Sequence, residues 1–269
     1  MAIERITIVT PSFNQACFIK DTLESVKNQG YDQVEHLVLD NCSTDGSLEI
    51  IRSYPSVHLI AEPDKGQSDA LNKGFKKADG DIIGWLNADD RYLPGCFTRV
   101  VDFFNKHPDC DIVYGDYRLI DGAGKLISNR QELPFDLFML KYLHVLYIPS
   151  TTVFFRRIFE EGNFLDEDYH YAMDYEYFLR LALKGYRFGY IPAYLADFRT
   201  HQDSKSQRQT VIQINEMEKA LALHDPLLSG LNGNTRMAVR RVLMGLACFK
   251  RYILKAIKGA YLERGYYAK

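Results

Sequence analysis

The stretch Ile6-Thr-Ile-Val-Thr-Pro-Ser-Phe-Asn14 predicts a β-strand that ends abruptly in a turn. Its first five residues are apolar or β-branched, a composition typical of strands, while Pro11 and Asn14 indicate the turn. A helical apolar pattern follows and ends at Gly30. The order strand, turn, helix is the repeating unit of an α/β fold.

The same unit recurs after Gly30 as far as residue 86. Further strands are expected at residues 36–40, 57–61 and 82–86, and helices at 47–54 and 68–78. Strands that alternate with helices predict a mainly parallel central sheet with helices on both faces. Ligands of such sheets bind beyond the carboxyl ends of the strands.

Polar side chains gather at that edge of the predicted sheet. Turn and capping chemistry accounts well for Ser12 and Ser47. It accounts poorly for the adjacent acids Asp89 and Asp90, which repel each other unless a cation or a solvated loop relieves them. Clustered carboxylates suit hard cations, so we favour a functional role for this pair. The residues that follow the four strands include Thr10, Ser12 and Asn14, then Asp40 and Asn41, then Asp64, Lys65 and Gly66, and finally Asn87, Asp89 and Asp90.

The second half of the chain is less regular. We expect strands at 111–116, 151–155 and 186–191, the last ended by Pro192, a hairpin over 117–127 around Asp121-Gly-Ala-Gly124, and a helix at 174–183. The glycines of the hairpin lack the third glycine and the strand-to-helix setting of a dinucleotide-binding motif.

The composition, with 46% hydrophobic and 25% charged residues in a chain of 269, is that of a globular protein with one domain and an appendage. Five scattered cysteines without a C-x-x-C pair argue against a disulfide framework or a zinc site. The amino-terminal residues lack the apolar stretch of a signal peptide. The run Val242–Phe249 is too short to span a membrane. We therefore expect a cytoplasmic protein, or one at the inner face of the membrane.

The carboxy-terminal segment is strongly basic. Residues 236–269 hold nine Lys or Arg and one acid, Glu263, a net charge of +8 within a chain whose total is −2. An acidic body argues against a nucleic-acid partner, and the basic tail favours an anionic one. Residues 236–258 predict an amphipathic helix, which would either pack on the main domain or lie on an anionic membrane surface; the sequence leaves both open.

Six stretches, in order, resemble the inverting glycosyltransferases of family 2, which have the GT-A fold. One motif alone would be a weak signal, whereas six in order over residues 3–205 are a specific one. The stretches are Thr10-Pro-Ser-Phe-Asn14, Leu39-Asp-Asn-Cys-Ser-Thr-Asp-Gly46, Glu62-Pro-Asp-Lys-Gly-Gln-Ser-Asp-Ala-Leu-Asn-Lys-Gly74, Gly84-Trp-Leu-Asn-Ala-Asp-Asp90, Met173-Asp-Tyr-Glu-Tyr-Phe-Leu-Arg-Leu181 and Phe198-Arg-Thr-His201.

The resemblance implies an α/β, GT-A type domain over 1–205, with nucleotide-sugar binding in 1–116 and the acceptor side and catalytic base in 117–205. Residues 206–269 would form a helical extension. The implied reaction moves a sugar from a nucleotide-diphosphate donor, a UDP-sugar being favoured, to a hydroxyl of a saccharide or lipid-linked acceptor, with inversion. Cell-surface polysaccharide synthesis is the implied setting.

The resemblance also implies the donor site. Asp40 would read the nucleobase, and the other nucleotide-sugar contacts would be Thr10, Pro11, Asn14, Asp64, Lys65, Gly66, Asp69, Asn72, Asn87, Ala88 and Asp89. Asp89 would be the metal-binding acid of the Asp-x-Asp motif, whose first acid is replaced here by Asn87. His201 would be a second ligand of a divalent metal, Mn²⁺ or Mg²⁺.

Asp174 falls where the family keeps its catalytic base, although Met173 replaces the acid that often precedes it. A residue at a helix start could instead serve as an N-cap. Two other functions stay open at this point: a nucleotidyltransferase, which should show a glycine-rich triphosphate loop where this chain has Pro11-Ser-Phe-Asn14, and a silent carbohydrate-binding protein of the same fold.

Overall fold

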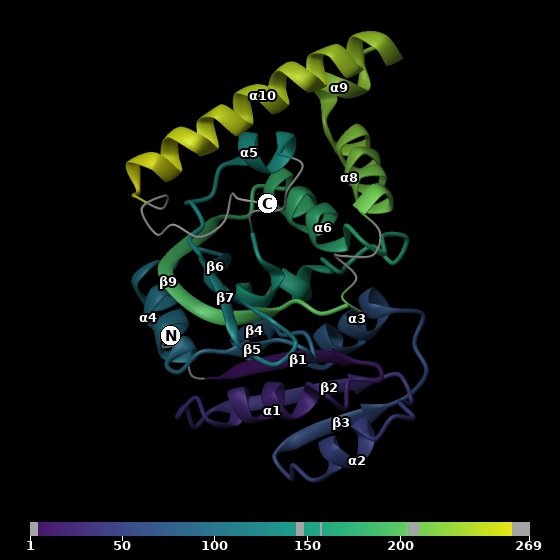
Figure 1. Ribbon diagram of the computed structural model, residues 1–269, viewed down its shortest axis with the longest axis vertical. Coiled ribbons are helices and arrows are strands. Elements are labelled where there is room, and N and C mark those ends of the chain that lie inside the picture. The colour runs from purple at the N-terminus through teal and green to yellow at the C-terminus, as the bar shows by residue number, and fades with distance from the viewer. Residues whose placement is uncertain (1–4, 144–147, 157, 203, 205–209, 260–269) are drawn as a thin grey trace.

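The computed structural model describes residues 5–143, 148–156, 158–202, 204 and 210–259. Its centre is a single mixed sheet with strand order β3-β2-β1-β4-β8-β6-β9-β5, in which β7 pairs with β6 (Figure 1). The strands are β1 Ile6–Ser12, β2 Val34–Asp40, β3 Val57–Ala61, β4 Ile82–Trp85, β5 Arg91–Tyr92, β6 Ile112–Ile120, β7 Leu126–Arg130, β8 Phe154–Arg156 and β9 Phe188–Arg199.

The four strands expected from the first half are present and parallel, with β1 between β2 and β4. The second half adds β8 antiparallel to β4, and β9 parallel to β6. The GT-A type α/β architecture with a mainly parallel sheet is thereby confirmed in its amino-terminal half, and the whole sheet is mixed.

Helices cover both faces of the sheet. Val9 of β1 packs into the core cluster that includes Phe75 of α3 and Phe178 of α6, whereas its neighbour Ile8 packs into the cluster that includes Phe97 of α4. Successive strand residues point to opposite faces of the sheet, so β1 contributes side chains to both hydrophobic cores. The helices are α1 Ile19–Lys27, α2 Ser47–Arg52, α3 Gln67–Lys77, α4 Cys96–Lys106, α5 Leu137–Tyr142, α6 Met173–Leu183, α8 Thr210–His224, α9 Pro226–Ser229 and α10 Gly233–Ile257, with short 3₁₀ helices at Ser150–Thr152 and Ile158–Glu161.

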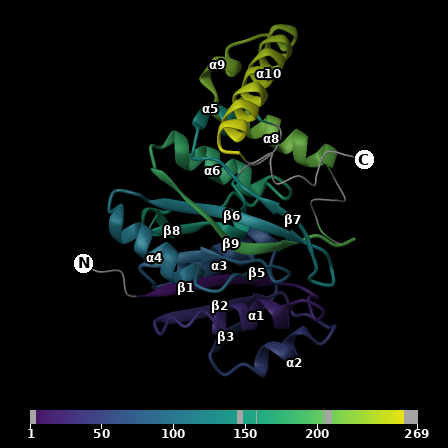
Figure 2. The same cartoon turned by 60° about the vertical axis from the view of Figure 1, so that its left-hand side comes forward.

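Figure 2 shows β3 and α2 at one end of the molecule and α10 at the other. Among the described residues, no helix combines the length and apolarity needed to cross a membrane.

Two expectations for the second half are wrong in detail. The strand expected to stop at Pro192 continues to Arg199, because its pairing with β6 skips Pro192 and Ala193 at a bulge, so the missing N–H of Pro192 breaks no ladder hydrogen bond. The strand expected at 151–155 starts at Phe154, since residues 150–152 form a 3₁₀ turn in which Thr152 is bonded to Gly115. The hairpin around Asp121 and Gly124 is present between β6 and β7.

Candidate active site

A cavity of about 470 Å³ opens at the carboxyl ends of β1 and β4, where the sequence predicted a ligand site. Its walls come from four regions: the loops after β1, β2 and β4, the start of α3, the segment that leads into α6, and the end of β9 with the residues that follow it. Gln213 of α8 closes part of the remaining side. The residues that line it include Pro11, Ser12, Phe13, Asn41, Asp64, Gly66, Gln67, Asn87, Ala88, Asp89, His170, Tyr171, Asp174, Arg199 and His201.

Asp40 ends β2 just behind this wall and is 1% exposed. Its carboxylate accepts hydrogen bonds from the Ser12 hydroxyl and from the backbone N–H and hydroxyl of Ser43. In this conformation Asp40 shapes the loop between β2 and α2, and the described cavity lining does not include it. A nucleobase could reach its oxygens only if Ser12 or Ser43 moved.

Thr10 and Asn14 lie next to the cavity-lining residues but are not among the described lining. The Thr10 hydroxyl lies 2.9 Å from Nε2 of the buried His36. Asn14, at φ 52°, accepts a bond from the Thr44 N–H, while its own N–H donates to the Ser43 hydroxyl. Only Pro11 of the three residues expected here faces the cavity.

The loop before α3 places Asp64 and Gly66 at the cavity. Asp64 accepts a bond from the Gly66 N–H, and Gly66 has a φ of 128°, a conformation that side chains disfavour. Partial burial raises the pKa of Asp64. Lys65 lies in the same loop, and its backbone N–H donates to the carboxylate of Asp69 in the first turn of α3.

Asn72 lies deeper in α3. Its side-chain amide pairs with both the N–H and the carbonyl of Leu165, so its described contacts join α3 to the segment before α6.

The loop after β4 directs its two acids to different surroundings. Asp89 Oδ2 lies 3.1 Å from Nε2 of His201, at the cavity. Asp90 is 1% exposed and accepts bonds from the Thr151 hydroxyl, the Asn87 amide and the backbone N–H of Arg199. Burial, and then the neighbouring charge of Asp89, raise the pKa of Asp90 well above its usual range.

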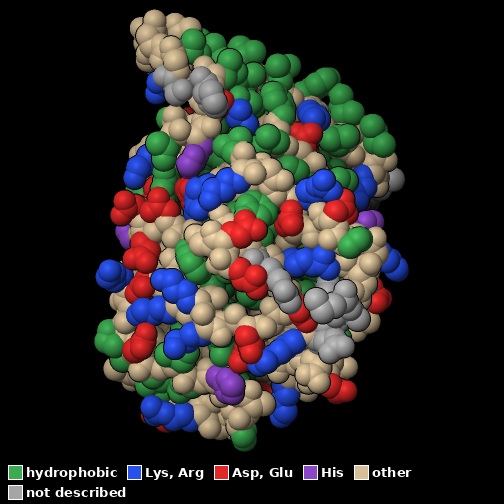
Figure 3. Space-filling view, turned by 180° about the vertical axis from the view of Figure 1, so that it is seen from behind, with side chains coloured by type: hydrophobic (Ala, Val, Ile, Leu, Met, Phe, Trp, Pro, Cys, Tyr) green, Lys and Arg blue, Asp and Glu red, His purple; other side chains and the backbone are tan. Residues whose placement is uncertain are grey.

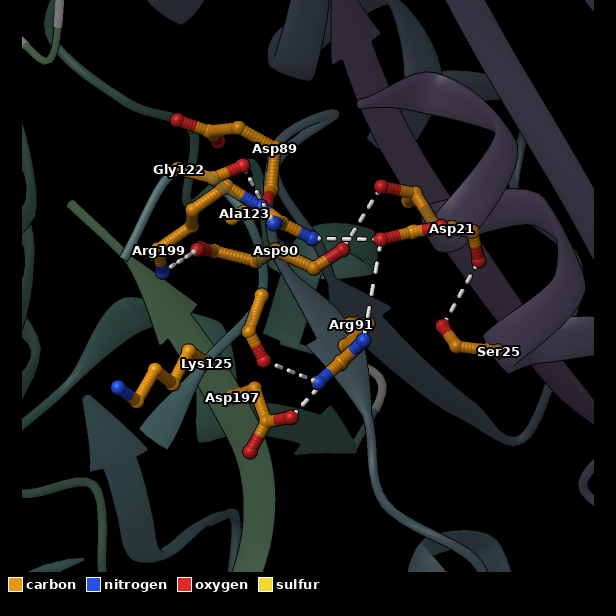
Figure 4. Close-up of polar contacts among 12 residues, drawn as sticks. Asp21, Ser25, Asp89, Asp90, Arg91, Gly122, Ala123, Lys125, Asp197 and Arg199 are labelled. Carbon is orange, nitrogen blue, oxygen red and sulfur yellow. Dashed lines mark hydrogen bonds and ion pairs between the residues drawn. The ribbon is translucent and has the colours of Figure 1, made fainter. Parts of the chain in front are cut away.

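Arg199 at the end of β9 ties this loop to the rest of the molecule (Figure 4). It is 2% exposed, and its guanidinium donates to the Asp89 carbonyl at 2.7 Å, to the Asp21 carboxylate at 2.8 Å and to the Gly122 carbonyl at 3.2 Å. The same side chain stacks over the Phe18 ring, which also contacts the ring of His201. Arg199 therefore fixes both the loop that carries Asp89 and the strand end that carries His201.

Asp174 lies in the first turn of α6 and lines the cavity. Ala172 occupies the N-cap position of α6, so Asp174 is not the N-cap residue that the sequence had left as an alternative. The Asp174 carboxylate accepts a hydrogen bond from the Tyr175 N–H.

The turn before α6 is held from outside by Glu216 of α8. Its carboxylate accepts bonds from the backbone N–H groups of His170, Tyr171 and Ala172, the last two at 2.8 Å. Such N–H groups at a helix start have no partner within the helix.

Several lining residues are absent from the sequence-based list. Phe13 is 55% exposed beside Pro11, and the Gln67 side-chain amide donates to the side-chain oxygen Oδ1 of Asn87. An exposed aromatic residue within the first motif was a usable signal for Phe13. Glu216 and Gln213 had no signal, because neither lies in a recognisable motif and their approach depends on the path of α8.

Asp89 and His201 are the two side chains that fit a divalent cation. A carboxylate oxygen and an imidazole nitrogen converge at 3.1 Å, and the amide of Asn87 is engaged by Gln67 and Trp85. Within the described part of the chain, no group of three or more His, Cys, Asp or Glu side chains forms a complete site. This donor set suits a cation that completes its shell with substrate phosphate oxygens and water, as Mg²⁺ commonly does.

Comparison with known proteins assigns the chain to a family. The family model described as glycosyl transferase family 2 matches residues 7–162, well over half of the chain. The chain belongs to glycosyltransferase family 2.

Relatives of this family 2 glycosyltransferase include proteins named for polysaccharide synthesis. It is 25% identical over 225 residues to TuaG of Bacillus subtilis, named as a teichuronic acid biosynthesis glycosyltransferase, covering 80% of this chain and 88% of TuaG. It is 29% identical to the chondroitin synthase of Escherichia coli over 67% of this chain but only 27% of the synthase, so some relatives are much longer proteins.

Solved structures confirm the fold. TarS 1–349 of S. aureus in complex with UDP-GlcNAc superposes with a TM-score of 0.67 at 16% identity, covering 97% of this chain and 76% of TarS 1–349. The mannosyltransferase PcManGT of Pyrobaculum calidifontis, in complex with GDP-Man and Mn²⁺, gives 0.58 at 16% identity, covering 97% of this chain and 88% of PcManGT.

Proposed function

We propose that this glycosyltransferase moves a sugar from a nucleotide-diphosphate donor, a UDP-sugar being favoured, to a hydroxyl of a saccharide or lipid-linked acceptor, with inversion. The observation that carries the proposal is one cavity lined both by Asp89 with its partner His201 and by Asp174. Its lining also includes the exposed ring of Phe13, which suits stacking against a nucleobase.

Asp174 is the proposed general base. It takes the proton of the acceptor hydroxyl while that oxygen bonds to the anomeric carbon, and the bond from this carbon to the diphosphate breaks with release of the nucleoside diphosphate. A single displacement of this kind inverts the anomeric centre. A positioned carboxylate contributes about 10²–10⁴-fold in rate to such a step.

Asp89 and His201 are the proposed ligands of Mn²⁺ or Mg²⁺, which when bound would offset negative charge on the departing diphosphate. In this proposal residues 1–116 bind the donor, residues 117–205 bind the acceptor and supply the base, and residues 206–269 form a helical extension. Residues 64–66 and 87–89 belong to the donor side of this proposal, with Lys65, Asp69 and Asn72 supporting its loop. A location at the inner face of a membrane fits a lipid-linked acceptor.

Two matched variants test the proposal in a screen of sugar nucleotides with Mn²⁺ or Mg²⁺. Asp174→Asn should stay folded and bind donor as the wild type does, yet lose about 10²–10⁴-fold in transfer. Asp89→Asn should instead lose metal-dependent donor binding, and excess chelator should have the same effect on the wild type. Transfer by Asp174→Asn within a few-fold of wild type, or a product of retained configuration, would contradict the mechanism.

A further inference from the structure

Helix α10 carries its apolar side chains on the outside of the molecule. Figure 3 shows hydrophobic side chains gathered along the upper edge of the molecule, where α10 lies. Their exposed fractions run from 39% to 79%. A contiguous exposed apolar patch of this kind marks an interaction surface, whereas apolar residues exposed singly do not. We call the following residues the outer face: Met237, Val242, Leu246, Phe249, Tyr252, Ile253 and Ile257.

The basic side chains of α10 point mostly toward the body of the protein. Arg240 donates to Glu218 at 3.0 Å and to the Tyr142 carbonyl, and it is 7% exposed. Lys250 pairs with Asp136. These contacts hold the amino-terminal and central parts of the helix.

The carboxy-terminal part is held in the same way. Arg251 and Lys255 both approach the carboxylate of Glu132, at 3.4 and 3.6 Å, and the Glu132 side chain is only 4% exposed. Lys258 lies 3.8 Å from Asp116 and donates to the Glu132 carbonyl. Turning the helix to bury its outer face would leave Glu132 buried without a partner, which is costly. The outward orientation is therefore fixed by the charges.

We propose that the outer face of α10 lies on an anionic lipid surface, with the helix axis parallel to the membrane plane. Its 25 residues span about 37 Å at 1.5 Å per residue, along the outer edge of the molecule (Figure 1). The helix contains no Asp or Glu, and Arg241 is exposed beside the apolar side chains. A broad exposed apolar face, with an exposed base beside it and no acid on the helix, is typical of helices that lie in the lipid interface.

Charge selects lipid over a second copy of the chain. Two α10 helices packed face to face would bring the exposed Arg241 of each against a partner helix that contains no carboxylate to receive it. Lipid phosphates complement the same charges. The helix is also connected to the active site through the chain. It follows α8 and the short helix α9, and α8 places Gln213 in the cavity wall.

This inference rests on the proposed location at a membrane and names the surface that makes the contact. Its test measures vesicle binding and does not depend on sugar transfer. The full chain is mixed with vesicles of phosphatidylcholine and phosphatidylglycerol, or of phosphatidylcholine alone, and bound protein is measured by flotation. The variant Leu246→Ser/Phe249→Ser is compared with Leu126→Ser/Leu183→Ser, which removes two large apolar side chains of 49% and 40% exposure from β7 and α6.

We expect the α10 variant to bind mixed vesicles at least tenfold more weakly than wild type, while the control variant binds normally. Part of the binding should survive about 0.5 M salt, since screening acts on charge and not on apolar contact. Equal binding by the α10 variant and wild type would overturn the proposal. So would a dimer in lipid-free solution, measured by sedimentation, that the α10 variant abolishes. Failure of sugar transfer with normal vesicle binding would bear on the proposed function alone.

Discussion

Glu216 is the residue through which the carboxy-terminal helices reach the proposed base. Its carboxylate accepts bonds from three consecutive backbone N–H groups of the turn that ends where α6 begins, and Asp174 is the second residue of α6. Hydrogen bonds to a charged acceptor are stronger than neutral ones and hold a turn in one geometry. Glu216 thus acts as a positioning residue for Asp174.

Glu216→Gln removes this charge at nearly constant size. We expect kcat for transfer to fall about tenfold or more while donor affinity stays near wild type, because the hydrogen bonds described for Glu216 go to the turn before α6. The control Glu218→Gln alters the neighbouring pair with Arg240 and should leave kcat unchanged. Steady-state kinetics give kcat at saturating donor, and the dependence of the rate on donor concentration gives the donor affinity. If both variants behave alike, the role of Glu216 is general stability.

His36 links the stability of the donor site to pH. It is buried beside Thr10, and burial lowers its pKa from 6.5 to about 3. The unfolded chain therefore binds a proton between these values that the folded chain does not, so stability falls as pH drops through this window, by up to about 1.4 kcal/mol per pH unit. Denaturant titrations should show a flatter pH dependence for His36→Gln than for wild type; identical slopes would contradict this account.

At the scale of elements, β9 matters most, since it extends from the core to the active site and ends in Arg199, two residues before His201. Arg199→Lys keeps the charge but offers a single nitrogen in place of the planar fork, so the Asp89 and Gly122 carbonyls lose their donor. We expect a loss of about 1–3 kcal/mol in the free energy of unfolding, together with weaker metal-dependent donor binding. Calorimetry and nucleotide titration measure the two. Unchanged metal-dependent binding would show that Arg199 does not position Asp89.

The sequence predicted the elements of the first half well because apolar strands and polar turns alternate there regularly. The sequence favoured a functional role for the pair Asp89 and Asp90, and the family resemblance assigned the metal to Asp89. It did not predict that Asp90 is buried, since this burial depends on Thr151 and on the end of β9, both distant in sequence. The length of β9 was missed because Pro192 normally ends a strand, and only the pairing with β6 shows the bulge that accommodates it.

For the whole molecule, the amphipathic pattern of 236–258 predicted α10 but not which face would look outward. That orientation depends on Glu132, Asp136 and Glu218, whose positions follow from the folding of other segments. The first alternative left open by the sequence is what the structure has: the helix packs on the body through its basic side and through Val239, Leu243, Ala247 and Leu254. The second, contact with a membrane, stays a proposal, and the exposed outer face leaves room for it.

Removing residues 233–269 should weaken the body itself. The truncation uncovers the apolar surface under α10 and leaves Glu132, 4% exposed, without Arg251 and Lys255. We expect a clearly lower melting temperature and increased binding of a hydrophobic dye, with nucleotide binding retained at low temperature. Thermal unfolding of the truncated and full-length chains makes the comparison; equal melting temperatures would mean that α10 contributes nothing to the body.

Asn87 donates its amide N–H to the buried carboxyl of Asp90, at 3.2 Å, and receives bonds from Trp85 and Gln67 on its oxygen. An aspartate at this position would restore the two-acid motif typical of the family, yet it would place an acceptor against an acceptor beside Asp90. The codons of asparagine and aspartate differ by one base, but the new carboxylate would have to share a proton with the buried carboxyl of Asp90 or displace that side chain. Gain of a second acid at position 87 is therefore coupled to the protonation or the position of Asp90.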